Sequence, residues 1–232
     1  MRFIIVACIL TAAAAAAEPS SPLQAIRPLL DEALKTFRTE GPKGWSFTQT
    51  TRGEDHSRVE RYDAAQPEFD RWTLLQQDDR APTPEEAQDY REKLSRRSRG
   101  GTAPRLTDQL DLTTLALVSE QGDRATLSAR LKPGESGDRT AKYLVARIGL
   151  HKPSRTIETF ELAAEAPFSP TLGVKISAMK TTLTYSLPDG DRPSLLQSST
   201  THLRGRAFFF KSLDADMTVT FTDYERATRK KK

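Results

Sequence analysis

The sequence predicts a mainly β protein of the α+β class: one curved antiparallel sheet, an open half-barrel, with an N-terminal helix and one further covering helix. Two observations favour this fold class. Most of the chain after residue 44 alternates apolar and polar residues with a period of two, and two segments carry helical signals. Because no long helical crossover follows residue 100, the strands must be joined mainly as antiparallel hairpins.

The first helix is expected over residues 22–37. Pro22 is tolerated in a first helical turn, and Gly41-Pro42 ends the segment. Between them the apolar residues recur at three- and four-residue steps, so they form one stripe that can face a core. These residues are Leu23, Ile26, Leu30, Leu34 and Phe37.

A second helix is expected to begin after Thr83 and to run to about Arg97, before Gly100-Gly101. Thr83 at the N-cap, Pro84 at the first position and Glu86 three residues after the cap form a capping box. The apolar positions in this helix are few. We therefore expect it to lie over another element and not inside the core.

Strands account for most of the remaining chain. The segment 213–222 alternates without an error and puts Leu213, Ala215, Met217, Val219 and Phe221 on one dry face. About ten such strands, each dry on one face only, must form one large sheet that curls around its apolar side. The other predicted strands are 45–51, 59–63, 71–76, 125–131, 144–150, 157–162, 183–187 and 195–203.

Two helices are too few to cover the apolar side of such a sheet. An incompletely filled half-barrel offers a concave apolar groove, which is typical of a site for an apolar ligand. The alternative is that the large side chains simply fill a core, and the sequence leaves both interpretations open. The candidate groove residues are Trp45, Phe47, Trp72, Leu127, Leu144, Ile148, Phe160, Leu183, Tyr185, Met217, Val219 and Phe221.

One segment does not fit the alternation. Phe208, Phe209 and Phe210 are consecutive and follow a strand, so their side chains point to both faces. One of those faces must be covered, and the loop around Pro167-Phe168 is a candidate for that cover.

The N-terminus indicates export. Residues 1–17 combine Arg2, a short apolar run and an alanine tract that ends in an Ala-x-Ala site before Glu18-Pro19. These are the parts of a secretory signal peptide, so the protein is expected to be secreted across the inner membrane into the periplasm. A lipoprotein signal with Cys8 as the lipidated residue is the alternative. Cleavage after residue 17 removes this only cysteine, and residues 18–228 are expected to form a single domain.

The formal net charge of +4 is concentrated in a basic tail, residues 229–232. The tail can contact anionic membrane surfaces peripherally, although a solvated terminus is the simpler interpretation. A second basic cluster lies between Arg91 and Arg99 but contains no interleaved aromatic residues, so no nucleic-acid partner is expected.

No catalytic motif is present, and the protein is expected not to be an enzyme. The three histidines lie in separate segments without metal-ligand spacing, and no serine lies in a Gly-x-Ser-x-Gly elbow. Asp214 and Asp216 share a strand face, but we interpret them as solvated acids and not as a metal or acid–base pair. No cofactor and no metal are expected.

The combination of a cleaved signal, an amphipathic first helix, the Trp-Ser-Phe-Thr-Gln-Thr strand at 45–50, an early meander and a long antiparallel run resembles the periplasmic lipoprotein-carrier superfamily, the LolA/LolB-like half-barrels. The resemblance implies an open sheet with a helical lid that holds acyl chains. The sequence also resembles a family of uncharacterised exported proteins of that shape, and this second resemblance implies no activity.

The expected function is that of an exported, non-catalytic binding protein that holds an apolar or acylated ligand, a lipid or lipoprotein acyl chains, in the groove. The alternative is a structural or protein-interaction module of the cell envelope, with a filled core and an exposed edge strand or tail that meets a partner.

Overall fold

The computed structural model describes residues 21–37, 43–97, 106–132, 140–208 and 210–227. The predicted signal peptide, the helix-ending Gly41-Pro42, the Gly100-Gly101 pair, Phe209 and the basic tail at 229–232 lie outside these residues.

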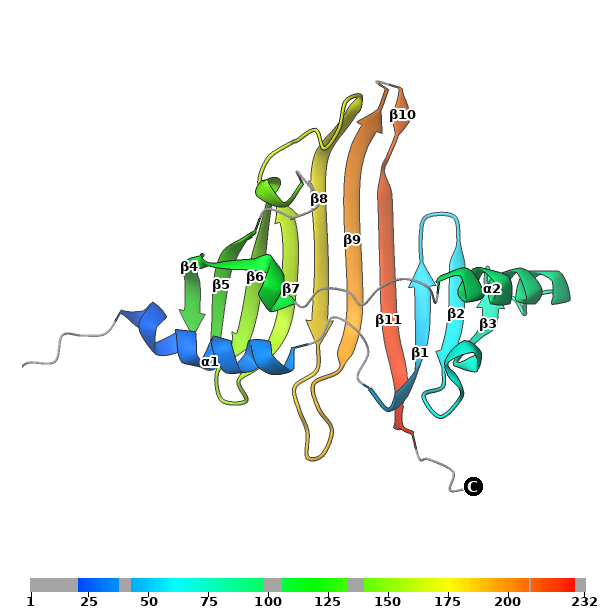
Figure 1. Cartoon of the computed structure of the whole chain (residues 1–232), viewed down its shortest axis with the longest axis horizontal. Coiled ribbons are helices and arrows are strands. Elements are labelled where there is room, and N and C mark those ends of the chain that lie inside the picture. The colour runs from blue at the N-terminus through cyan, green and yellow to red at the C-terminus, as the bar shows by residue number, and fades with distance from the viewer. Residues whose placement is uncertain (1–20, 38–42, 98–105, 133–139, 209, 228–232) are drawn as a thin grey trace, which may run out of the picture.

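The described chain forms one sheet of eleven antiparallel strands in the order β3-β2-β1-β11-β9-β8-β7-β6-β5-β4, with β10 paired to β9 (Figure 1). The outermost strands β3 and β4 are not paired to each other, so the curved sheet is open and the predicted fold class is confirmed. The strands are β1 (Trp45–Arg52), β2 (Ser57–Tyr62), β3 (Trp72–Gln77), β4 (Leu110–Gln121), β5 (Arg124–Leu131), β6 (Leu144–His151), β7 (Thr156–Ala164), β8 (Val174–Tyr185), β9 (Leu196–Ala207), β10 (Lys211–Ser212) and β11 (Ala215–Arg226).

Both expected helices are present. Helix α1 (Pro22–Thr36) crosses the β4–β7 half of the sheet, and α2 (Pro84–Arg97) lies at the other end, over β2 and β3 (Figure 1). The α2 capping box forms as predicted: the Glu86 amide donates to Thr83 Oγ1 at 3.2 Å, and the Thr83 amide donates to Glu86 Oε2 at 2.7 Å. The shorter helical segments are α3 (Leu106–Gln109) and the 3-10 turns Glu68–Asp70 and Ala141–Tyr143.

Strand register shows that both helices cover the same face of the sheet, which we call the helix face. Residues directly opposite each other in antiparallel strands share a face. One row therefore runs across the sheet from a position under α1 to a position beside α2. This row consists of Leu127, Ile148, Phe160, Leu183, Ser199, Val219, Thr51 and Arg58.

The hydrophobic core lies between α1 and strands β4–β7. Leu30 of α1 is fully buried, and Ile26 nearly so, against Leu127, Ile148 and Leu150. The stripe predicted for residues 22–37 therefore faces the sheet as expected. A smaller apolar cluster lies apart from this core and is built around Leu144, Phe168 and Ile176.

Three strand predictions need correction. The strand predicted at 183–187 is the end of the longer β8, which begins at Val174 and ends at Tyr185. The strand predicted at 213–222 begins two residues later, at Ala215, and its supposedly dry face is open: Ala215 and Met217 are exposed, and Val219 is half-buried. The reason is that neither α1 nor α2 reaches over this part of the sheet. Strand β4 was not predicted, because register shifts at 111–116 and 117–119 interrupt its alternation.

Candidate ligand-binding groove

A groove of about 630 Å³ opens on the helix face, beside α2. Strands β11, β1, β2 and β3 supply its floor, and Leu94 of α2 supplies part of its wall. Its apolar lining is Trp72, Leu94, Met217 and Val219, and its polar lining is Gln49, Thr51, His56, Arg58 and Glu60.

Glu60 is the buried anion of the groove. Its carboxylate accepts a hydrogen bond from the Tyr90 hydroxyl at 2.7 Å and another from Gln49 Nε2 at 3.1 Å. Burying a carboxylate is costly unless it is paired and hydrogen-bonded. These contacts meet that condition, and they also tie α2 to the sheet.

Arg58 lies between Glu60 and Tyr90. Its Nη1 is 3.8 Å from Glu60 Oε1, and its guanidinium carbon is 5.9 Å from the centre of the Tyr90 ring. Its Nε is buried and has no hydrogen-bond partner among the described residues. A buried donor without a partner is costly and calls for an explanation.

A second hollow of about 420 Å³ adjoins the groove on the other side of Arg58. Arg58 and Leu94 line both spaces. The remaining residues around this hollow are more polar and come from β3, the turn after it and α2, with Asp78, Asp89 and Lys93 among them. The groove and the hollow together thus combine apolar and charged side chains.

An aromatic cluster supports the apolar end of the groove. The Phe47 ring lies 5.7 Å from the rings of both Trp72 and Phe221, and Tyr62 lies 5.1 Å from Trp72. Such tilted and edge-to-face pairs add to the stability that area burial provides. They fix Trp72 at the groove wall.

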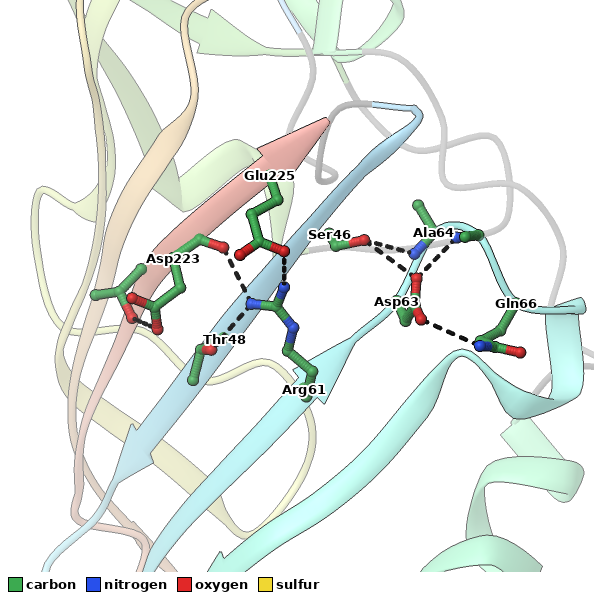
Figure 2. A network of polar contacts seen from close by, with 10 residues as sticks. Ser46, Thr48, Arg61, Asp63, Ala64, Gln66, Asp223 and Glu225 are labelled. Atoms are coloured by element: carbon green, nitrogen blue, oxygen red, sulfur yellow. Dashed lines mark hydrogen bonds and ion pairs between the residues drawn. The ribbon is translucent and has the colours of Figure 1, made fainter. Parts of the chain in front are cut away.

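On the opposite face, a polar clamp holds β11 beside β1 (Figure 2). Arg61 of β2 reaches across β1: it donates to the Asp223 carbonyl at 3.0 Å and pairs with Glu225 Oε2 at 2.7 Å. Nearby, Asp63 accepts hydrogen bonds from the Ala65 amide and from Ser46, and the first of these is the main reason why its pKa is lowered. The clamp fixes the strands that form the groove floor.

The base of α2 is held by a charged pair. Arg80 donates to both carboxylate oxygens of Glu86, at 2.6 and 2.9 Å. The Arg80 guanidinium and the Thr83 amide lower the pKa of Glu86 to about 2. Glu86 therefore serves both the capping box and a bidentate ion pair.

The twelve predicted groove residues do not share one site. Leu127, Ile148 and Phe160 are buried in the core under α1, with Leu183 at its margin, while Leu144 belongs to the separate cluster. Burial raises the pKa of Tyr185, which packs edge-on against Phe37 with ring centres 5.0 Å apart. Trp45 is half-buried at the start of β1, and Phe47 and Phe221 belong to the aromatic cluster; Trp72, Met217 and Val219 line the groove.

Two polar residues of the groove, Arg58 and Glu60, were not predicted as site residues, and neither was Tyr90, which donates to Glu60. A signal was present: Gln49 and Thr51 alternate in phase with Trp45 and Phe47, so polar side chains occupy inward positions of that strand. Polar residues at inward positions of a sheet indicate a polar site on its covered face.

The two acids singled out in the sequence are engaged in local contacts. Asp216 pairs with Arg204 at 2.5 Å and with His202 at 2.6 Å, and Asp214 accepts from the Gly205 amide at 3.0 Å. Hydrogen bonding to Arg204 lowers the pKa of Asp216. Within the described ranges, no group of three or more metal-ligating side chains comes together, and no helix has the length and apolarity to span a bilayer.

No protein-family model matches the chain, and a search of the curated proteins finds no match. Among solved structures the chain is similar to an isomerase-inactive variant of GphF DH1, with 10% identity, 90% of this chain and 83% of that chain covered, and a TM-score of 0.17. The chain is also similar to a GphF dehydratase variant made for improved crystallization. The identity is 11%, the match covers 89% of this chain and 84% of that chain, and the TM-score is 0.15. Both TM-scores are too low to carry an argument about fold or function.

Proposed function

We propose that this protein is an exported, non-catalytic binding protein that holds an amphipathic ligand in the groove beside α2. The apolar part of the ligand lies against Trp72, Met217 and Val219, and its anionic or carbonyl head lies near Arg58. A lipid or the acyl chains of a lipoprotein have this chemistry.

One observation carries the proposal: Arg58, whose side chain is 34% exposed and whose Nε has no partner among the described residues, lines an open groove whose apolar side chains are half-buried or exposed. Ligand sites typically combine an apolar lining with a few placed polar groups. An acyl chain would bury the apolar side chains, and its head group would accept from Arg58.

Two further features support a lipoprotein-carrier type of activity. The open antiparallel sheet with helices on one face is the arrangement that the resemblance implies. The signal-peptide pattern at residues 1–17 supports export to the periplasm, where such a carrier would act. N-terminal sequencing of the protein purified from its native host tests export: we expect Glu18 as the first residue, and a chain that begins at a modified Cys8 would contradict this.

The binding experiment compares the wild-type protein with Arg58→Met. Mass spectrometry of an organic extract of native protein should show acyl species in stoichiometric amounts, and an environment-sensitive fatty-acid probe should bind to the stripped protein. Arg58→Met should weaken probe binding about tenfold or more, because a charge-assisted hydrogen bond is lost. Arg130→Met is the matched control, since Arg130 is exposed and pairs only with exposed Glu165 at 3.3 Å among the described residues.

The two outcomes are distinct. Weaker probe binding by Arg58→Met, with wild-type probe binding by Arg130→Met, supports the groove as the binding site. Equal probe affinity in wild type, Arg58→Met and Arg130→Met, together with an extract free of acyl species, would refute the proposal.

A structural or protein-interaction role is the second candidate, and the open sheet edges favour it. Edge strand β3 exposes Leu75 and edge strand β4 exposes Val118. Unpaired edges are templates for an added strand from a partner. Under this alternative the protein carries no ligand, and Val118→Lys disrupts partner binding while Arg58→Met does not.

A further inference from the structure

Two loops meet at the end of the sheet where β8 begins and β9 ends, the upper end in Figure 1. The Phe208 amide donates to the Gly173 carbonyl at 2.6 Å, and the Phe208 ring lies over Gly173, where a Cβ would stand 3.1 Å from it. Gly173 has a φ of +79°, a conformation that glycine adopts without strain. These contacts join the two loops, and we call their described residues 171–173, 208 and 210 the apolar tip.

The apolar tip presents three large apolar side chains to solvent. Leu172 is 97% exposed, Phe210 86% and Phe208 62%. The expectation that the loop around Phe168 covers this segment is wrong for Phe208 and Phe210. Phe168 is instead buried below the tip, where it bridges to Ile176 and stacks on Tyr143 at 4.8 Å.

Cations surround the base of the apolar tip. Lys175 lies directly opposite Arg206 in the β8–β9 pair, and Lys211 follows Phe210 at the start of β10. In the part of the chain that the structure describes, none of these three cations forms an ion pair. The nearby acids are already engaged: Asp214 accepts from the Gly205 amide, and Asp216 pairs with Arg204.

We infer that the apolar tip inserts into the interface of an anionic lipid bilayer, which goes beyond the proposed binding function and does not depend on it. Exposed apolar side chains in one patch mark an interaction site. A projecting tip needs no matching pocket in a fluid interface, and Lys175, Arg206 and Lys211 lie where they can reach anionic head groups. The Phe208 amide would enter the interface already paired, which avoids the cost of an unsatisfied donor.

Cosedimentation of the full chain with vesicles tests the inference, with phosphatidylglycerol–phosphatidylcholine vesicles compared with phosphatidylcholine alone. Leu172→Ser/Phe210→Ser should reduce partitioning to the anionic vesicles about tenfold or more, since two apolar side chains lose their lipid contact. Phe69→Ser is the matched control, because Phe69 is 72% exposed on the turn before β3 and lies outside the tip. It should partition as wild type does.

Lys211→Glu supplies an independent variant. This substitution should weaken binding to anionic vesicles but not binding to neutral ones, because the Lys211 ammonium is attracted to anionic lipid head groups. The effect should be largest at low salt, since salt screens this attraction. All three variants change exposed side chains and should keep the wild-type thermal midpoint.

The same experiment separates the apolar tip from the basic tail. Strand β11 ends at Arg226 at the other end of the sheet (Figure 1), so a chain lacking residues 229–232 should retain tip-dependent partitioning. The inference is overturned if deleting 229–232 alone abolishes binding. It is also overturned if Leu172→Ser/Phe210→Ser partitions like wild type, or if those substitutions abolish a concentration-dependent dimer in sedimentation velocity while vesicle binding is absent throughout.

Discussion

The two ends of the sheet each carry one helix on the same face, yet one end is a filled core and the other an open groove. Leu30 of α1 is fully buried, as are Leu127 and Ile148 in the strands beneath it. Beside α2, the floor carries Glu60 and Arg58, while Val219 is only half-buried and Met217 is 38% exposed.

The composition of the helices explains the difference. Helix α1 offers a continuous stripe that includes Ile26, Leu30 and Leu34, and so it excludes water from the strands below. Helix α2 is held to the sheet by the hydrogen bond from Tyr90 to Glu60, and its Leu94 lines both the groove and the adjoining hollow. A helix with few apolar positions can be held by polar contacts and still leave space beneath it.

The strongest test of this comparison places the same charge at two positions of one register row. Ile148→Asp buries an unpaired carboxylate in the filled core, which costs several kcal/mol out of a total stability of ~5–15 kcal/mol, so the variant should fail to fold. Val219→Asp lies at the groove floor, where water reaches the acid, and should fold with a modest loss. Circular dichroism melts measure both effects.

Val219→Asp should also lose most of its affinity for a fatty-acid probe, because a charge now lies where an acyl chain would. Thr218→Asp is the control on the exposed opposite face of the same strand, and it should melt and bind as wild type does. A folded Val219→Asp protein with wild-type probe affinity would contradict the groove. A fully unfolded one would contradict the contrast between the two ends.

A smaller effect is expected from the contact that holds α2. Tyr90→Phe removes the hydroxyl that donates to Glu60 at 2.7 Å and leaves a buried carboxylate short of one donor, at a cost of about 1–3 kcal/mol. Chemical denaturation measures this loss. Tyr143→Phe is the control, since the Tyr143 ring stacks on Phe168 and has no corresponding carboxylate contact among the described residues. Equal midpoints for the two variants would mean that the hydrogen bond to Glu60 does not stabilise α2.

Period-two alternation and helix capping predicted most of the fold because both depend on local rules. The α2 capping box at Thr83 and Glu86, the α1 stripe and the antiparallel sheet follow directly from spacing. Strand β4 escaped because its bulges interrupt the period. The face of 213–222 alternates perfectly but is not covered, because alternation records which residues share a face and not whether another element packs on it.

The candidate site could be predicted only in part. Trp72, Met217 and Val219 follow from apolar alternation, whereas Arg58 and Glu60 lie in a short strand whose inward positions are polar. Their pairing with Tyr90 joins segments 30 residues apart in sequence, and no local rule encodes that distance. The consecutive phenylalanines drew attention to the apolar tip in the sequence. Their exposure depends on whether the loop after β7 covers them, and alternation does not specify the position of that loop.

The smallest expected effect is a pH dependence confined to the α2 end. Because the pKa of Glu86 is lowered from 4.5 to about 2, this carboxylate stabilises the folded protein above pH 4.5, and its contribution is lost as the pH falls toward 2. The α2 base should therefore loosen over that interval. Trp45 and Trp72 both lie in strands at this end of the sheet, so tryptophan fluorescence reports on it.

Glu86→Gln removes the titrating group and should shrink the fluorescence change between pH 4.5 and 2. Glu85→Gln is the control, because Glu85 lies in the same helical turn and its carboxylate makes no ion pair within the described ranges. This control variant should retain the fluorescence change. An acid transition of unchanged size in Glu86→Gln would show that other carboxylates hold this end of the sheet.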